Sequence, residues 1–466
     1  TGVTSPEPDG PYGIGDAIAI KVKFDEPVQL GGEPPILHLP DGRTAVYVSG
    51  AGTDELVFEY TVQPGDASLD LDYESTASLD LRSGTLTDEA GNPGDPTLPP
   101  PGSPGSLGGG KDLVIDGAGP KVTGVTSPEP DGPYNAGDAI EIHVKFDEPV
   151  FLSGEAPVLR FPDGRTARYV SGGGTDELVF EYVVQPGDTA ADLDYESTTA
   201  LDLRSGTLTD EAGNPGDPTL PPPGSPGSLG GGKDLVIDTD PPTALLVTSP
   251  LPDGSYKAGD VITVTVVFDE PVTVAGGTPT LALETGATDR LATYTGGTGT
   301  NTLTFTYTVQ PGDQTADLES LSTGALALGG ATIQDAAGND ASLTLPALGS
   351  SGSLGGVKDL AIDGVAPRVL DVTSPQADGG YKAGDTVLVQ VKLSESVTVA
   401  GGTPTLALET GATDRVATLV AGNGTDTLVF AYVVQPGDRT PDLDYASAGA
   451  LSLNGATLTD AAGNPG

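Results

Sequence analysis

The sequence contains no cysteine, no methionine and no tryptophan in 466 residues. Without cysteine the chain has no disulfide, no zinc thiolate and no thiol nucleophile. No apolar run reaches the roughly 18 to 20 residues that a membrane-spanning helix needs, so we expect no direct insertion into a membrane. Because an initiator methionine and a signal sequence are both missing, we expect the chain to be a processed or excised part of a longer protein.

Histidine is also scarce. His38 and His143 are the only two, and they occupy different positions within alternating segments, where a core or surface role is expected. A Ser-His-Asp or Cys-His arrangement is therefore not indicated. Paired carboxylates suit a glycosidase, but the acidic pairs recur along the chain, which fits a repeated structural requirement better than one active site. We expect no enzymatic activity.

Basic residues are few compared with acidic ones. The chain carries 66 Asp and Glu against 20 Lys and Arg, a net charge of −46. Such a charge repels nucleic acids and anionic membrane surfaces, so neither is an expected partner. Divalent cations are the partners that this composition favours.

One sequence unit is present four times. Tyr12, Tyr134, Tyr256 and Tyr381 each begin a Tyr-x-x-Gly-Asp phrase, at intervals of 122 to 125 residues. This period is longer than a solenoid repeat and matches an independent domain. The sequence therefore predicts four domains, at residues 1–118, 119–240, 241–365 and 366–466.

Each repeat consists of short alternating segments separated by Gly and Pro turns. In the second copy, period-two alternation and turn signals predict strands over 121–126, 139–146, 157–161, 166–170, 177–184, 206–209 and 233–238. Pro149 is expected to end the second strand, and 215–232 to form a long surface loop. About seven strands without a helical period predict an all-β chain of four tandem immunoglobulin-like β-sandwich domains. Short connections between them predict an elongated rod.

Tracing the strands up and down places acidic turns at both poles of every domain. At the first joint between domains we expect Asp16, Asp66 and Asp116 to approach Asp147, Glu148, Asp176 and Asp210. Bare carboxylates a few ångströms apart repel each other, so a bound cation is expected between them. Ca²⁺ fits best, because it takes 6 to 8 oxygen ligands in flexible geometry. The other ligand candidates in the four copies are Glu26, Asp88, Asp138, Asp188, Asp238, Asp260, Glu270, Asp313, Asp335, Asp363, Asp385, Glu395, Asp438 and Asp460.

The phrases of the third copy carry a resemblance. Residues 268–283, 302–313, 335–339 and 352–363 look like the tandem Ig-like repeats of large bacterial surface and adhesin proteins. The resemblance covers essentially the whole chain. It implies secretion, an extracellular or cell-surface location, and calcium-stiffened spacers between an anchor and a terminal binding domain.

Two structural roles remain open. The first is the spacer of a long surface protein. The second is a subunit of a surface layer or filament, joined to identical subunits by strand donation or calcium-bridged contacts. The second role is suggested by the fourth copy, which lacks the long loop and the Lys-Asp-Leu-x-Ile-Asp strand of the others.

Overall fold

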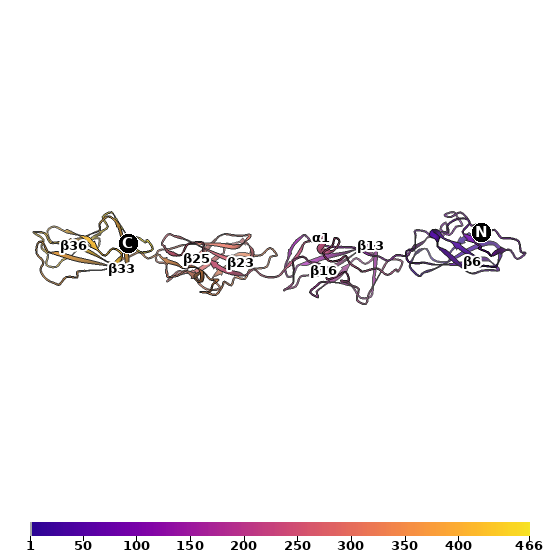
Figure 1. Ribbon diagram of the computed structural model, residues 1–466, viewed down its shortest axis with the longest axis horizontal. Helices are drawn as coiled ribbons and strands as arrows, with labels where there is room; N and C mark the ends of the chain where they lie inside the picture. The colour runs from indigo at the N-terminus through magenta and orange to yellow at the C-terminus, as the bar shows by residue number, and fades with distance from the viewer. Residues whose placement is uncertain (1) are drawn as a thin grey trace. The chain divides into compact units, whose positions relative to one another are not determined.

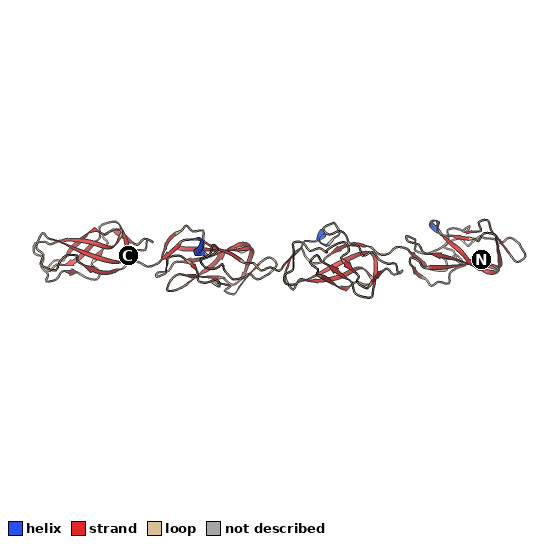
Figure 2. Ribbon diagram, turned by 60° about the horizontal axis from the view of Figure 1, so that its bottom comes forward, coloured by secondary structure: helices blue, strands red, loops and turns tan. Residues whose placement is uncertain are grey.

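The computed structural model describes residues 2–466 and is all-β, with the repeated sandwich units that the sequence predicts. The chain divides into two compact units, residues 1–239 and 240–466, and each contains two repeats. Strands dominate every repeat, and the helical pieces are short (Figure 2). Within residues 2–466, no helix is both long enough and apolar enough to span a bilayer.

The first unit holds repeats 1 and 2, which follow one element order. Repeat 1 consists of β1 (Gly2–Thr4), β2 (Gly10–Tyr12), β3 (Ala17–Gly31), β4 (Ile36–His38), the 3-10 helix η1 (Pro40–Gly42), β5 (Thr44–Ser49), β6 (Thr53–Thr61), β7 (Ala67–Ser68), β8 (Leu79–Asp80), β9 (Thr85–Thr87) and β10 (Leu113–Asp116). Repeat 2 consists of β11 (Val122–Thr126), β12 (Gly132–Tyr134), β13 (Ala139–Ser153), β14 (Val158–Arg160), β15 (Thr166–Ser171), β16 (Thr175–Val183), β17 (Thr189–Ala190), β18 (Leu201–Asp202), β19 (Thr207–Thr209), α1 (Leu229–Gly232) and β20 (Leu235–Asp238).

The second unit holds repeats 3 and 4. Repeat 3 consists of β21 (Ala244–Thr248), β22 (Gly254–Lys257), β23 (Val261–Gly276), β24 (Thr280–Glu284), β25 (Arg290–Gly296), β26 (Thr300–Thr308), β27 (Gln314–Thr315), β28 (Glu319–Ser320), β29 (Leu326–Ala327), β30 (Ala331–Gln334), α2 (Leu354–Val357) and β31 (Leu360–Asp363). Repeat 4 consists of β32 (Val369–Thr373), β33 (Thr386–Gly401), β34 (Thr405–Glu409), β35 (Arg415–Ala421), β36 (Thr425–Val433), β37 (Asp444–Tyr445), β38 (Leu451–Ser452) and β39 (Ala456–Thr459).

Repeat 2 illustrates the sheet topology. Its large sheet, which includes β13 and β16 (Figure 1), has the order β11-β13-β16-β15-β14-β18, with β19 paired to β13, and a smaller sheet has the order β12-β20-β17. The last strand, β20, runs parallel to β12 and antiparallel to β17. Phe180 of the large sheet and Ile237 of the small one belong to the same buried core. Closing the repeat with β20 therefore fixes the position of Asp238 at one pole.

The expected strand break at Pro149 is wrong. β13 continues through Pro149 to Ser153, although its register with β16 shifts between Lys145 and Val150. Beyond the shift, β13 pairs with β19 instead. Proline has no backbone N–H to donate to a neighbouring strand. It is tolerated here because the regular ladder of hydrogen bonds is interrupted in this stretch. Glu148 lies in the same stretch, outside the regular pairing.

The short strands were also missed. The sequence predicted about seven strands for repeat 2, whereas β12, β17 and β18 bring the number to ten. The predicted loop at 215–232 contains α1, a single turn capped by the Ser228 hydroxyl, which accepts from the Gly231 N–H. These pieces of two to four residues are too short to show a hydrophobic period.

Repeat 4 differs from the other three at its core. Among its described residues there is no counterpart of the small sheet β12-β20-β17. Tyr445 has 42% of its surface exposed, whereas Tyr195, its equivalent in repeat 2, has 1%. Tyr381 is likewise 40% exposed. In repeats 1 to 3 the closing strand covers this place, and the sequence ends at Gly466, before its counterpart in repeat 4.

Candidate metal centre

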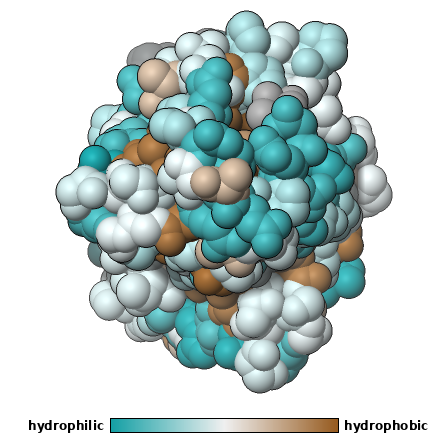
Figure 3. Space-filling view, turned by 90° about the vertical axis from the view of Figure 1, so that its right-hand side faces the viewer, coloured by the Kyte–Doolittle hydropathy of each residue, from teal (hydrophilic) through white to brown (hydrophobic). Residues whose placement is uncertain are grey.

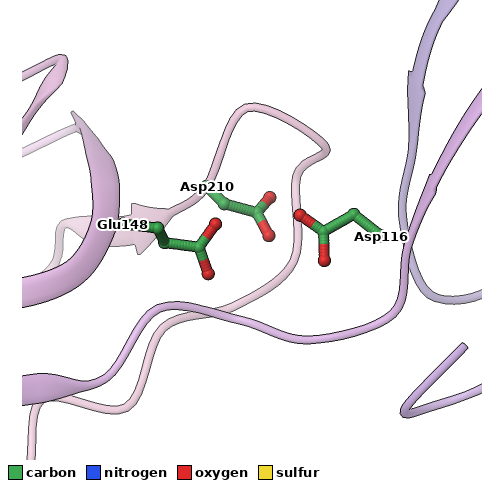
Figure 4. Close-up of side chains that lie close together, drawn as sticks. All are labelled: Asp116, Glu148 and Asp210. Carbon is green, nitrogen blue, oxygen red and sulfur yellow. The ribbon is translucent and has the colours of Figure 1, made fainter. Parts of the chain in front are cut away.

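Three carboxylates meet where repeats 1 and 2 join. Asp116, Glu148 and Asp210 each offer one oxygen, and these oxygens lie within 4.8 Å of one another. Figure 4 shows the three carboxylates directed into a common space. Oxygens that bind one Ca²⁺ at 2.3–2.6 Å are at most about 5 Å apart, so the spacing suits a single ion. We name Asp116, Glu148 and Asp210 the first triad.

Different elements position the three residues. Asp116 ends β10 of repeat 1, and Glu148 lies in the irregular stretch of β13 in repeat 2. Asp210 follows β19 and begins the turn that ends at Asn214, whose backbone N–H donates to Asp210 Oδ1 at 2.8 Å. The triad thus takes one ligand candidate from the preceding repeat and two from the following one.

The electrostatics of the first triad are unfavourable for bare anions. Burial, followed by the negative charges of Asp116, Asp210 and Asp147, raises the pKa of Glu148 to about 7. Asp210 itself is only 3% exposed. Desolvation and like charge both disfavour the ionised form, and a cation among the oxygens relieves both effects.

The second unit repeats this arrangement between repeats 3 and 4. Asp363 ends β31, Glu395 lies in β33, and Asp460 follows β39, with one oxygen from each within 4.8 Å of the others. Burial and then the charges of Asp363 and Asp460 raise the pKa of Glu395, although the Ser394 hydroxyl opposes them. We name Asp363, Glu395 and Asp460 the second triad.

Several predicted ligands lie outside these triads and have turn-forming roles. Asp16, Asp138, Asp260 and Asp385 accept a hydrogen bond at 2.9 Å from the backbone N–H three residues earlier. Each therefore closes its own Tyr-x-x-Gly-Asp turn. Asp16 is not one of the first triad, and its role in metal binding stays a prediction.

The aspartates of the Gln-Pro-Gly-Asp turns have other partners. Asp66, Asp188, Asp313 and Asp438 each accept hydrogen bonds from a tyrosine hydroxyl and from the backbone N–H three residues earlier. In repeats 2, 3 and 4 an arginine adds an ion pair, as Arg290 does with Asp313 at 2.8 Å. In these three repeats the arginine supplies a positive charge beside the aspartate. A role of the four aspartates in metal binding stays a prediction.

The remaining candidates are spread over other positions. Asp147 accepts from the Lys121 N–H at 2.7 Å, and Asp176 is exposed in β16. Glu26 is exposed, and Asp88 is held by Asn92 in a turn like that of Asp210. Asp238 ends β20 in the first unit, whereas Glu270 lies in β23 and Asp335 follows β30 in the second. A role of these residues in metal binding stays a prediction.

The linker of the first joint is held at both ends. Gly117 donates to Asp66 O at 2.7 Å and accepts from Gly65 at 2.8 Å, which fixes it to repeat 1. Pro120 O accepts from the Asp217 N–H at 2.8 Å, which fixes it to repeat 2. A Cβ at Gly117 would lie 2.4 Å from Gln63 O, so only glycine allows this approach. Two residues, 118 and 119, lie between the anchored residues Gly117 and Pro120.

Sequence reasoning missed one residue, Asn214. Its side chain is 1% exposed and bonds to both repeats of the first joint. A signal was available, because Asp-x-Ala-Gly-Asn recurs in all four copies. The aspartate of that phrase was singled out as a ligand, whereas its asparagine was not.

Repeat 1 contains the same turn between Asp88 and Asn92. Asn92 is exposed, although its backbone and side-chain nitrogens bond to Asp88 at 2.8 and 2.6 Å as those of Asn214 do to Asp210. Figure 3 looks onto the end of the N-terminal repeat, where hydrophilic surface predominates around smaller apolar patches. The turn therefore forms without the contacts of a joint.

Comparisons with known proteins give weak likenesses. No protein-family model matches the sequence, and no curated protein matches it. Among solved structures, the chain is similar to a three-Ig structure of titin in an E-to-A mutated variant, at 10% identity and a TM-score of 0.25, over 74% of this chain and 95% of that one. The plexin A4 extracellular region gives 10% identity and a TM-score of 0.17, over 94% of this chain and 35% of that one.

A surface layer protein, SbsC domains 4-9, gives 10% identity and a TM-score of 0.15, over 94% of this chain and 82% of that one. Scores this low carry no argument about function. The sheets and cores of the four repeats show what the chain is at the level of fold: an all-β chain of tandem Ig-like sandwich units.

Proposed function

We propose that this chain is a calcium-stiffened structural spacer of an extracellular surface protein. The observation that carries the proposal is the recurrence of one triad at two joints. Asp116, Glu148 and Asp210 of the first unit correspond residue by residue to Asp363, Glu395 and Asp460 of the second. A chance group of surface acids would not be expected to recur at equivalent joints with the same residue types.

The ligand chemistry supports calcium over other cations. Every donor of both triads is a carboxylate oxygen, and the residues 2–466 contain neither thiolate nor histidine at these places. Oxygen donors favour Ca²⁺ or Mg²⁺ over zinc or copper, and three carboxylates from separate elements suit the flexible coordination of Ca²⁺ better than the strict octahedron of Mg²⁺. The bound ion would neutralise the triad and draw two repeats together.

The surface location rests on the sequence resemblance to bacterial surface and adhesin repeats. An acidic, cysteine-free chain whose domains are joined by ion-bridged contacts suits a calcium-rich exterior. Secretion, adhesion and a bacterial origin are parts of the same proposal.

A calcium titration of the full chain tests this function. Chelated protein is titrated with Ca²⁺, with Mg²⁺ as the comparison, while thermal unfolding and the maximum dimension in solution scattering are followed together. We expect Ca²⁺ to raise the melting temperature by mass action and to lengthen the average end-to-end distance. If both quantities stay unchanged at millimolar Ca²⁺, the proposed function is wrong.

A further inference from the structure

We propose that Asn214 and Asn464 are interdomain latches that hold their joints together without metal and at the same time position the buried aspartate of each triad. The positioning part rests on the proposed calcium function, whereas the latch part does not. The side-chain nitrogens of Asn214 and Asn464 donate to Asp210 Oδ2 and Asp460 Oδ2. The two asparagines would act through these aspartates, so they are positioning residues.

The first step of the argument is the set of partners of Asn214. Its Oδ1 accepts from the backbone N–H of Ile14 at 2.6 Å, in the Tyr-x-x-Gly-Asp turn of repeat 1. Its Nδ2 donates to Asp116 O at 2.8 Å, at the end of β10 in the same repeat. One side chain of repeat 2 therefore bonds to two separate segments of repeat 1.

The second step is that the same nitrogen also holds the triad. Asn214 Nδ2 donates to Asp210 Oδ2 at 2.6 Å, while the Asn214 backbone N–H donates to Asp210 Oδ1. The amide thus uses its acceptor and both of its donors. Because one hydrogen bond is charge-assisted and the site is nearly dry, the arrangement is held firmly.

The third step is burial. Asn214 and Asp210 are 1% and 3% exposed. A buried amide that loses its partners leaves polar groups unsatisfied, so opening the joint has a cost even when no cation is present. The asparagine is therefore expected to favour the closed joint before metal binds, with Asp210 already oriented, and calcium to stiffen that joint further.

The second unit provides an independent copy. Asn464 is 2% exposed, accepts from the Ala258 N–H at 3.2 Å, and donates to Asp363 O at 2.6 Å and Asp460 Oδ2 at 2.7 Å. Lys257 adds a further bond across this joint, from Nζ to Gly463 O at 3.1 Å. In both units the asparagine side chain thus connects a backbone N–H of the Tyr-x-x-Gly-Asp turn, the backbone oxygen of the aspartate that ends the last strand, and the buried aspartate of the triad.

The test uses the full chain and a matched pair of substitutions. Asn214→Ala removes the bonds across the joint, whereas Asn92→Ala removes the same bond within a turn, to Asp88, where the asparagine is exposed. The absence of natural cysteine allows spin labels at Leu69→Cys and Val170→Cys, two exposed positions in repeats 1 and 2. Distances between the labels are measured by pulsed electron paramagnetic resonance in chelator and in Ca²⁺.

In chelator, the proposal predicts a distance distribution for Asn214→Ala that is clearly broader than those of the wild-type background and of Asn92→Ala, which calcium narrows further. An Asn214→Ala distribution as narrow as the wild type would overturn the latch. This arm is informative whether or not calcium binds, because it is carried out without metal.

The positioning part has its own readout. Hydrogen exchange of peptides covering residues 113–120 is followed during a calcium titration, and the midpoint reports affinity at the first joint. We expect Asn214→Ala to weaken calcium binding by about 10-fold or more, as loss of a ligand-orienting partner does, and Asn92→Ala to leave it unchanged. Equal midpoints for the two variants would overturn the positioning role. A wild-type chain without any midpoint would overturn that role and the calcium function together, but the distance result in chelator would still decide the latch.

Discussion

The guanidinium of Arg290 pairs with the carboxylate of Asp313 through Nε at 2.9 Å and Nη2 at 2.8 Å, and the aspartate side chain is 1% exposed. Tyr307 donates to the other carboxylate oxygen. This buried group of arginine, aspartate and tyrosine links the start of β25 to the Gln-Pro-Gly-Asp turn of repeat 3. It accounts for an aspartate that the sequence alone assigned to calcium.

Removing the arginine should destabilise repeat 3 selectively. Arg290→Ala leaves the Asp313 charge buried and unpaired, which we expect to reduce the free energy of unfolding by about 3 kcal/mol. Arg160→Ala is the control, because its pair with Asp202 is half-exposed at the arginine and should contribute less than about 1 kcal/mol. Hydrogen exchange of peptides from each repeat during denaturant titration measures both. Equal effects would contradict the structural role of the Arg290–Asp313 pair.

The same group predicts how repeat 3 responds to acid. Burial alone would raise the pKa of Asp313, but the hydrogen bonds from Arg290 and Tyr307 outweigh it and lower the pKa below its usual value. A carboxyl with a lowered folded-state pKa stabilises the fold above its unfolded pKa, and this contribution is lost as the pH falls. We expect unfolding of repeat 3 on acidification below about pH 4.

In Arg290→Ala, burial remains and the opposing hydrogen bonds are reduced, so the acid transition should begin at higher pH than in the wild type. Circular dichroism and repeat-resolved hydrogen exchange between pH 7 and pH 2 follow it. An unchanged onset would show that the pair does not set the pKa.

Neutralising one carboxylate of the first triad should have opposite effects with and without calcium. In chelator, Glu148→Gln removes a repulsion with Asp116 and Asp210 and should stabilise the joint by about 1 kcal/mol. In calcium the same variant loses a ligand and should be less stable than the wild type. Glu26→Gln is the matched control, because Glu26 is the exposed equivalent in repeat 1. Thermal unfolding under both conditions measures the difference, and a change of the same sign in both would argue against the triad as a cation site.

The linker anchor at Gly117 gives a metal-independent prediction. A Cβ there would lie 2.4 Å from Gln63 O and 2.7 Å from Asp66 N, both backbone atoms. Gly117→Ala should therefore break the two hydrogen bonds to repeat 1 and speed amide exchange at Gly65 and Asp66. Gly232→Ala is the control, because a Cβ there meets no atom within 4 Å. Exchange at Gly65 as slow as in the wild type would show that the linker tolerates the methyl group.

Sequence reasoning expected seven acids at the first joint, and the structure brings oxygens of three of them, Asp116, Glu148 and Asp210, within 4.8 Å of one another. Alternation of strand direction up and down the sandwich predicts that these three approach. The sequence did not reveal the partners of Asp188, which are Tyr182 and Arg165. The packing and pairing of β15 and β16 set these contacts, and the turn sequence alone does not show them. Sequence reasoning also ended β13 at Pro149, because a local proline rule cannot show that the strand changes partner from β16 to β19.

The most direct measurement of the central claim is a crystal structure of the full chain grown with calcium, with anomalous scattering recorded to locate the ions. We predict an anomalous peak between the carboxylates of Asp116, Glu148 and Asp210, with metal–oxygen distances of about 2.3–2.6 Å, and an equivalent peak between Asp363, Glu395 and Asp460. Density for water alone at both places, in crystals soaked with millimolar calcium, would contradict the account.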